Sequence, residues 1–301
     1  MLNIEEITGY VNDNKTQLIT KAVLLGDTIS KMNLIEGVKQ SANLHTVIND
    51  VKLQDGNACG FNPANEQNFT NRVLQVGTYA VQDEICPKDF QNTWQSYELK
   101  IAATTNEKNV PSFVEYWTNS TVEKIQAENE RLVWLGGIDD EAGIEADGLV
   151  QILNNEADTI KPTIASGATI FDKVMAAYLA MPVEISKRDD AFIAVNWADF
   201  KALTFELIQK NLYNYATGLN ADNGVLVLPG TNCKIYAVSG LGTESYIIAG
   251  AWGECYVGTD ILGDSSDYYV WMTDKRTIGL DINFNLGVQV AFPSNFVLIA
   301  E

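Results

Sequence analysis

The chain has few of the residues and motifs on which most enzymes depend. It contains a single histidine, His45, in an alternating segment, SANLHTVIND, of the kind that forms strands. General-base and triad mechanisms mostly use histidine, and the sequence has neither a phosphate-binding glycine loop nor a serine-hydrolase elbow. We therefore predict no catalytic residue and no cofactor, and interpret His45 as an ordinary strand side chain.

Cysteines are scarce and widely spaced. The four are Cys59, Cys86, Cys233 and Cys255, and no two form a CxxC pair that could begin a zinc or redox site. We expect buried, reduced thiols and a reducing compartment. A disulfide between Cys59 and Cys86 is the alternative, supported only by their proximity in sequence.

One acidic segment could bind a hard cation through oxygen ligands. It contains Asp139, Asp140, Glu141, Glu145 and Asp147, but lacks the spacing of a calcium loop. Acids that follow a Gly-Gly helix stop are typical of a solvated turn, so we predict no metal site. A carboxylate pair for glycoside cleavage leaves no local signature, and a carboxylate-dependent hydrolase is therefore kept as an alternative of a different class.

Basic residues are also few. Lys and Arg number 20 against 39 Asp and Glu, which gives a formal net charge of -19. Such a chain does not wrap tightly around nucleic acid, so we expect any DNA nearby to be enclosed without sequence-specific binding. Copies of the chain repel one another, and their association should depend on ionic strength.

Long apolar runs are absent. The longest, around 174–183 and 246–252, fall well short of the roughly 20 residues that cross a bilayer. The N-terminus, MLNIEEITGYVND, has acids where a signal peptide has Lys or Arg. We expect a soluble chain with no membrane contact that is not exported by that route.

The N-terminal part of the sequence is predicted to form an arm. A helical stretch is predicted around 14–25, where Leu18, Ile19, Ala22 and Leu25 repeat at helix spacing. These apolar residues have few local partners. The arm should therefore pack on the body of its own chain or on a neighbour.

A long β-hairpin or loop is predicted next. Alternating segments at 45–53 and 72–81 flank a polar middle, DGNACGFNPANEQN. Connections longer than about 12–15 residues without structure are unusual unless they have a role. We expect this segment to project onto a partner.

A long helix is predicted from 112 to a stop at Gly136 and Gly137. Apolar side chains such as Trp117 and Ile125 fall roughly on one side, while charged residues such as Glu130 fill the rest. At 1.5 Å per residue this helix is about 35 Å long, which suggests a spine for the molecule.

A compact α/β domain is predicted over about 143–258, followed by strands. The expected helices are 169–181 and 197–212, with Asn196 or Asp199 as a cap, and the expected strands are 191–195, 225–228 and 234–238. The tail should form strands at 268–273, 277–290 and 296–300. We expect the C-terminus to return to the base of the hairpin and complete a second sheet, so that one domain is inserted into another.

Aromatic residues of the second half could form a sugar-binding or base-stacking platform. They are Trp252, Tyr256, Tyr268, Tyr269 and Trp271. Strands carry such residues for packing, so we favour core or subunit-interface packing. A surface carbohydrate-binding module is a further alternative.

The order of these parts resembles that of the tailed-phage major capsid proteins with the Hong Kong 97 fold. The local likeness lies in LVQILNN at 149–155, LPGTNCKIYAVSGL at 228–241, YIIAGAWGECYVGTD at 246–260 and VQVAFPSNFVLIA at 288–300. The resemblance implies an α+β fold with four parts. These are an N-terminal arm (1–37), an extended loop or E-loop (38–90), a P-domain with the spine helix (91–142 and 259–301), and an inserted A-domain (143–258).

The resemblance also implies a function made of interfaces between copies. The chain would assemble into pentamers and hexamers of an icosahedral shell that encloses phage double-stranded DNA, in a virion capsid built in the host cytoplasm. Portal, scaffold and decoration proteins are the implied partners, and a nanocompartment shell of the encapsulin type is the alternative of the same fold. The candidate self-assembly residues are Leu18, Leu25, Lys52, Asp55, Phe61, Phe69, Trp117, Arg131, Asp222 and Asn223.

Overall fold

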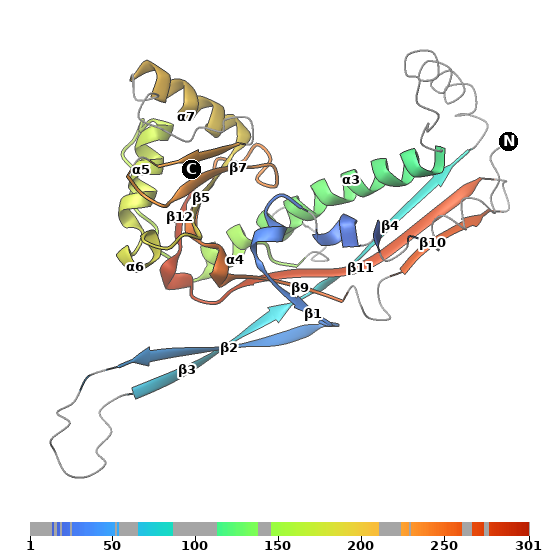
Figure 1. Ribbon diagram of the computed structural model, residues 1–301, viewed down its shortest axis with the longest axis horizontal. Coiled ribbons are helices and arrows are strands. Elements are labelled where there is room, and N and C mark those ends of the chain that lie inside the picture. The colour runs from blue at the N-terminus through green and yellow to red at the C-terminus, as the bar shows by residue number, and fades with distance from the viewer. Residues whose placement is uncertain are drawn as a thin grey trace, which may run out of the picture.

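The structure, a computed structural model, consists of two sheets joined by one long helix, with a hairpin projecting from the body (Figure 1). It describes residues 14, 17–18, 20–24, 26–51, 53, 66–86, 113–137, 146–210, 224–228, 230–260, 267–273 and 277–300. None of the helices within these ranges is both long enough and apolar enough to cross a membrane. The α+β class that the sequence predicts is confirmed.

The first sheet is built around one long strand, β11 (Ile278–Val290). Along one side β11 pairs with β4 (Gly77–Ile85), and along the other it pairs with β10 (Asp267–Met272) and then β9 (Cys255–Thr259), all antiparallel. Strand β1 (Asn33–Glu36) adds to β9 in parallel. Two of the three predicted tail strands therefore lie in this sheet.

The spine helix is confirmed as α3 (Phe113–Trp134), which lies along the first sheet (Figure 1). Its apolar side chains Trp117, Ile125 and Trp134 are buried in a core shared with β11. The helix ends where predicted, because Gly136 adopts a φ of 55°, a left-handed conformation that L side chains rarely adopt.

The second sheet has the strand order β12, β8, β5, β7, β6. These strands are β12 (Val297–Ile299), β8 (Ile247–Ala251), β5 (Ala191–Asn196), β7 (Lys234–Val238) and β6 (Val225–Val227). Every residue of the central strand β5 is buried, as expected for a strand covered on both faces.

Helices cover the two faces of the second sheet. On one face lie α5 (Ile170–Ala180) and α7 (Trp197–Gln209), with the short α6 (Val183–Ser186) at its border. On the other face, toward the spine helix, α4 (Leu149–Asn155) packs with α3. Thr169 and Asp172 form a capping box at the start of α5. Asn196 caps α7 by accepting a hydrogen bond from the backbone N–H of Asp199, which decides between the two predicted caps.

One prediction about the C-terminus is wrong. The strand expected at 296–300 does not pair with the base of the hairpin; β12 pairs with β8 in the second sheet, while β11 takes the place beside β4. Hydrogen bonds between Ile160 and both Phe296 and Leu298 fix β12 there. A short apolar run that is buried on both faces fits either sheet, so its sequence does not reveal which one it joins.

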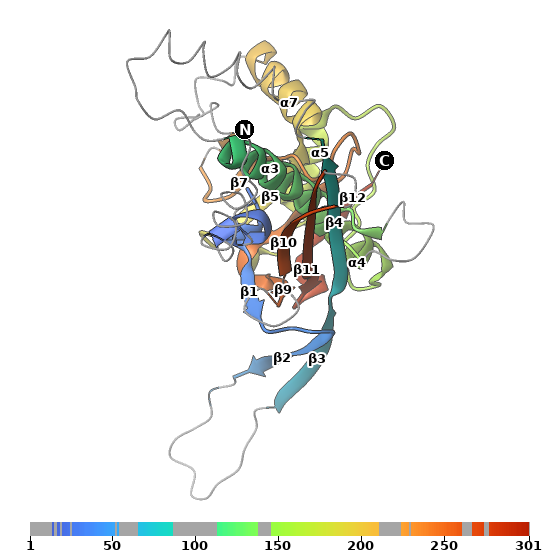
Figure 2. The ribbon, with the colours of Figure 1, turned by 90° about the vertical axis from the view of Figure 1, so that its right-hand side faces the viewer.

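The predicted hairpin is formed by β2 (Ser41–Asp50) and β3 (Glu66–Gln75), which pair antiparallel over ten residues each. It extends away from the body in both views (Figures 1 and 2). The segment expected as one strand at 72–81 divides at Val76, because β3 belongs to the hairpin and β4 to the first sheet. Of the polar middle at 55–68, residues 66–68 belong to β3 and residues 55–65 lie outside the described part of the chain.

Candidate assembly interface

The N-terminal segment packs against the spine helix of its own chain through a buried carboxylate. Glu130, on α3, is only 3% exposed, although the sequence pattern placed it on the polar side of the helix. Its carboxylate accepts hydrogen bonds from the backbone N–H of Thr28 at 2.8 Å, from the Thr28 hydroxyl, and from the N–H of Ile29 at 3.4 Å. Trp134, one turn along, donates from Nε1 to the same hydroxyl at 3.0 Å.

Two amides on the same face of α3 bind the preceding helical residues. Asn129 donates to the carbonyl of Ala22 at 3.0 Å and Gln126 to that of Lys21 at 2.6 Å. Residues 20–24 are helical and Gly26 is not, so the carbonyl of Ala22 lies near the end of this helix, where side chains often act as hydrogen-bond partners. The face of α3 that carries these amides, Glu130 and Trp134 therefore acts as a receptor for residues 21–29.

Glycines allow the base of the hairpin to lie very close to the first sheet. Leu74 is fully buried, and a Cβ atom at Gly258 would lie 2.3 Å from its Cδ2. At Gly287, a Cβ atom would lie 2.0 Å from the carbonyl oxygen of Gln75. Any larger residue at Gly287 would push the hairpin backbone away, since that neighbour is main chain.

A polar clamp adds to this contact. Arg72 in β3 pairs with Glu156 just after α4 at 2.5 Å and donates to Gln289 in β11 at 3.3 Å. Gln289 in turn donates to the carbonyl of Val73 at 2.9 Å. These contacts fix the direction in which the hairpin leaves the body.

Beyond its base the hairpin exposes apolar side chains. Phe69 is 73% exposed, and Val51 and Leu53, which follow β2, are exposed as well. An isolated two-stranded hairpin is at best marginally stable in water, so an extension of this length fits a role in contact with another surface. Phe69 is the one predicted assembly residue on the described part of the hairpin.

The two sheets meet at a cluster of charged and polar groups. Arg188 pairs with Asp190 at 2.7 Å and with Glu254 at 3.0 Å, and Asn295 donates to both oxygens of Glu254. Burial raises the pKa of Glu254, whereas the hydrogen bond from Arg188 lowers the pKa of Asp190. Asn33 of β1 donates to the carbonyl of Gly253, so the first sheet is tied to the same cluster.

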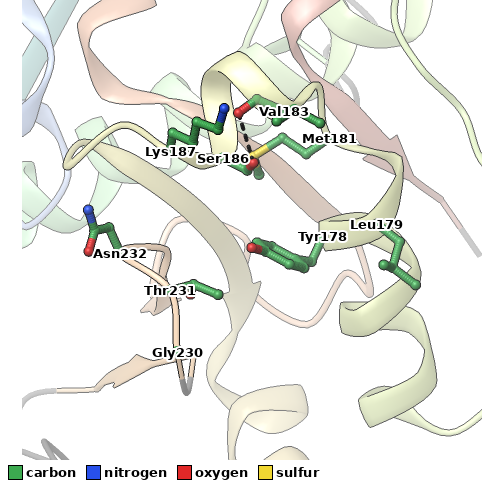
Figure 3. A pocket seen from close by; sticks show the side chains of 9 residues that line it. All are labelled: Tyr178, Leu179, Met181, Val183, Ser186, Lys187, Gly230, Thr231 and Asn232. Carbon is green, nitrogen blue, oxygen red and sulfur yellow. Dashed lines mark hydrogen bonds between the residues drawn. The ribbon is translucent and has the colours of Figure 1, made fainter.

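A groove of about 500 Å³ lies where the end of α5, α6 and the turn between β6 and β7 meet (Figure 3). Leu179 and Val183 are exposed there, and Ser186 donates to the carbonyl of Val183 at 3.1 Å. The nine described residues that line it include Lys187 but neither a carboxylate nor a histidine. This groove therefore offers no carboxylate pair of the kind a hydrolase would need.

The described ranges contain no group of three or more acidic, His or Cys residues placed to hold a metal. Of the acidic segment, only Asp147 lies in the described part of the chain, and it is exposed. His45 is an exposed strand residue opposite Asn71.

The thiols agree with the prediction of buried, reduced cysteines. Cys233 and Cys255 are fully buried, and burial raises the pKa of Cys233 to about 12. Cys86, partly buried, is also a free thiol, so the alternative disulfide with Cys59 is not formed. Cys59 itself lies outside the described residues.

The aromatic residues of the second half do not form one platform. Trp252 and Tyr268 are buried, and Trp252 stacks on Phe192 with ring centroids 3.8 Å apart. Tyr269 and Trp271 are about half exposed on β10. Core packing, the favoured interpretation, holds for the first pair.

Of the predicted assembly residues, the structure describes Leu18, Phe69, Trp117 and Arg131, and these four do not form one surface. Leu18 and Trp117 are buried in the chain's own core at 3% and 8% exposure, so they are not available as contacts between copies in this structure. Helix spacing identifies a buried face but not whether the partner is the same chain. Arg131 pairs with Glu128 on its own helix at 2.9 Å. The remaining predictions, outside the described residues, are Leu25, Lys52, Asp55, Phe61, Asp222 and Asn223.

Sequence reasoning missed the residues that organise these contacts, among them Glu130, Arg72 and Glu254. Each acts through a partner at least 60 positions away in the sequence. No local sequence pattern identifies such a residue. The sequence around Glu130, for example, is the same as that expected around a solvent-exposed Glu in an amphipathic helix.

Comparisons with known proteins give a match in structure alone. No protein-family model and no curated protein matches the sequence. A chain of the satellite phage P4 procapsid, which includes the size determination (Sid) protein, superposes with a TM-score of 0.63 at 11% identity, over 95% of this chain and 90% of that one. The capsid of the empty GTA particle gives 0.54 at 10% identity, over 93% and 89%. A virus-like particle from Pyrococcus furiosus gives 0.51 at 11% identity, over 95% and 98%.

These matches cover nearly the whole chain on both sides. At such low identity they establish the fold, which is the Hong Kong 97-like capsid fold that the sequence predicted.

Proposed function

We propose that this chain is a major capsid protein of a tailed phage, which assembles with copies of itself into the pentamers and hexamers of an icosahedral shell. The observation that carries the proposal is a fold shared along almost the entire chain with subunits of capsids. The projecting hairpin supports it, because its apolar side chains are exposed in the single chain and would gain contacts in an assembly.

The proposed shell would enclose double-stranded DNA without gripping it. A net charge of -19 opposes tight binding of a polyanion. The subunit would serve in the virion capsid, be assembled in the host cytoplasm, and meet portal, scaffold and decoration proteins. Its role would be structural, with the described grooves and charged clusters serving packing and orientation.

Assembly should respond to salt. Two subunits of this charge repel each other at low ionic strength, and salt screens that repulsion within about 10 Å at roughly 0.1 M. Each contact can be weak because closure of a ring or shell multiplies it. The test is sedimentation and electron microscopy of the purified protein across a range of ionic strength. Rings or closed particles that increase with salt are expected; a sharp monomer at high concentration and moderate salt would overturn the proposal.

A shell that holds a protein cargo, of the encapsulin type, is the second candidate. The fold is shared with a virus-like particle from Pyrococcus furiosus, so a shell of this fold is not restricted to particles described as phage capsids. Purification from the native source separates the two: DNA and packaging proteins would accompany a phage shell, and an enzyme would accompany a nanocompartment.

A further inference from the structure

Helix α7 carries apolar residues on both of its faces. Its inner residues, Phe200 and Leu203, are buried under the second sheet. On the opposite side Trp197, Phe205 and Ile208 are 41%, 60% and 53% exposed. A surface helix normally carries polar residues on the side away from the core, so three large apolar side chains on the outer face of α7 point to a surface that is covered in an assembly.

The exposed residues of α7 form one stripe, which we call the outer stripe. It consists of Trp197, Ala198, Lys201, Ala202, Phe205, Ile208 and Gln209. Helix α7 lies at the top of both views and the hairpin at the bottom (Figures 1 and 2). The outer stripe is therefore a surface separate from the one that the hairpin presents.

Trp197 is held rigidly at the start of the stripe. Its ring lies against Gly224, where a Cβ atom would come within 2.8 Å of Cη2, and it packs edge-on against Phe200 with centroids 6.1 Å apart. Rigid, partly exposed tryptophans are frequent anchors of protein interfaces, because little side-chain freedom remains to be lost on binding.

The charge of the stripe indicates what covers it. Its one charged residue is Lys201, while the molecule as a whole carries a net charge of -19. Asp199 and Glu206 of α7 are only partly exposed, and Glu206 accepts a hydrogen bond from the N–H of Phe171. Strongly acidic copies can approach closely only where carboxylates do not face each other, and a lone lysine complements an acidic partner.

The surface next to the outer stripe, around α5 and α6, carries exposed carboxylates that the stripe lacks. Around α5 and α6 the exposed residues include Asp172, Glu184 and Asp189. The apolar groups of the stripe expose roughly 300 Å² if aromatic side chains present about 200 Å² each when free. Because a standard interface buries about 800 Å² on each partner, the stripe would form the apolar centre of a contact whose rim comes from adjacent surfaces.

We infer that the outer stripe of α7 is a contact surface for a second copy of this chain. The inference rests on the proposed shell function and specifies one of its interfaces: Trp197, Phe205 and Ile208 are its apolar anchors, and Lys201 faces carboxylates of the neighbouring copy.

The experiment compares full-length variants by sedimentation velocity and electron microscopy under conditions in which the wild type assembles. The double substitution Phe205→Asp with Ile208→Asp should raise the concentration needed for assembly by at least about 100-fold, as loss of two interface anchors does. Lys201→Glu should also weaken assembly, with an effect that shrinks as salt is raised. Leu179→Asp, at a site of α5 that is 76% exposed and so more exposed than Phe205 or Ile208, is the control and should assemble as the wild type does.

Each outcome bears on the inference. If the aspartate pair assembles normally, or if Leu179→Asp is equally defective, the outer stripe is not the contact and the inference is overturned while the shell proposal stands. A wild type that never assembles defeats the shell proposal itself. If the aspartate pair instead lowers the melting temperature of the monomer, the stripe is covered by the chain's own residues and the inference also fails.

Discussion

Replacement of Glu130 by Ala should detach the N-terminal segment from the spine helix while the rest of the subunit stays folded. The substitution leaves two backbone N–H groups and the Thr28 hydroxyl without their buried acceptor. Each unsatisfied buried donor costs about 1–3 kcal/mol. We expect the summed cost to exceed the free energy that holds this short segment on α3. The segment should then leave the helix, and water would satisfy the freed donors.

The measurement is hydrogen exchange of the amides at 26–32. A loss of about 3 kcal/mol in docking corresponds to exchange faster by about 100-fold. Glu130→Gln keeps one acceptor oxygen and should show a smaller effect. Glu128→Ala is the control, because it removes an exposed ion pair with Arg131 on the same helix, which is worth at most about 1 kcal/mol. If the Glu130→Ala variant exchanges no faster at 26–32 than this control, the receptor role of Glu130 is refuted.

Three further predictions concern the hairpin, the charged cluster and the thiols. Gly287→Ala should displace the hairpin base at a cost of about 1–3 kcal/mol, seen as faster exchange at 71–76, since its Cβ would meet the carbonyl of Gln75; unchanged exchange would contradict this. The pKa of Glu254 is raised, so its ionised form destabilises the fold at neutral pH. The wild type should therefore gain stability relative to Glu254→Gln as pH falls from 7 toward 4.5. The pKa of Asp190 is lowered, so the wild type should lose stability relative to Asp190→Asn as pH falls below the usual range of an aspartate. Denaturant titrations of the three proteins at several pH values test the two opposite signs. With its pKa raised to about 12 by burial, Cys233 should resist alkylation at pH 8 until the protein unfolds, whereas rapid modification of the native protein would show that the site opens.

The sequence predicts best those elements whose signals are local. The spine helix ends at its glycines, and α5 and α7 begin at their capping residues, because caps and stops act within one helical turn. The hairpin was found from alternation around a polar middle, and its strands pair as expected.

The failures arise where tertiary contacts decide. Nothing in the residues 297–299 distinguishes the second sheet from the first, and Glu130 differs from a solvated glutamate only through Thr28, about a hundred positions earlier. For Leu18 the sequence left open whether its partner is its own chain or a neighbour, because periodicity shows that a face is buried but not by which chain; in the structure it lies in the core of its own chain. Local patterns in a single sequence therefore do not reveal which residues far apart in the chain will contact each other.

The placement of β12 has a consequence for biosynthesis. The second sheet begins with a strand at 191–196, yet its edge is closed only by residues 297–299, after the chain has crossed into the first sheet and back. A growing polypeptide that has not reached residue 297 leaves β8 with an unoccupied side. Ribosome-bound intermediates therefore carry a second sheet whose β8 edge stays unpaired until residues 297–299 have been made.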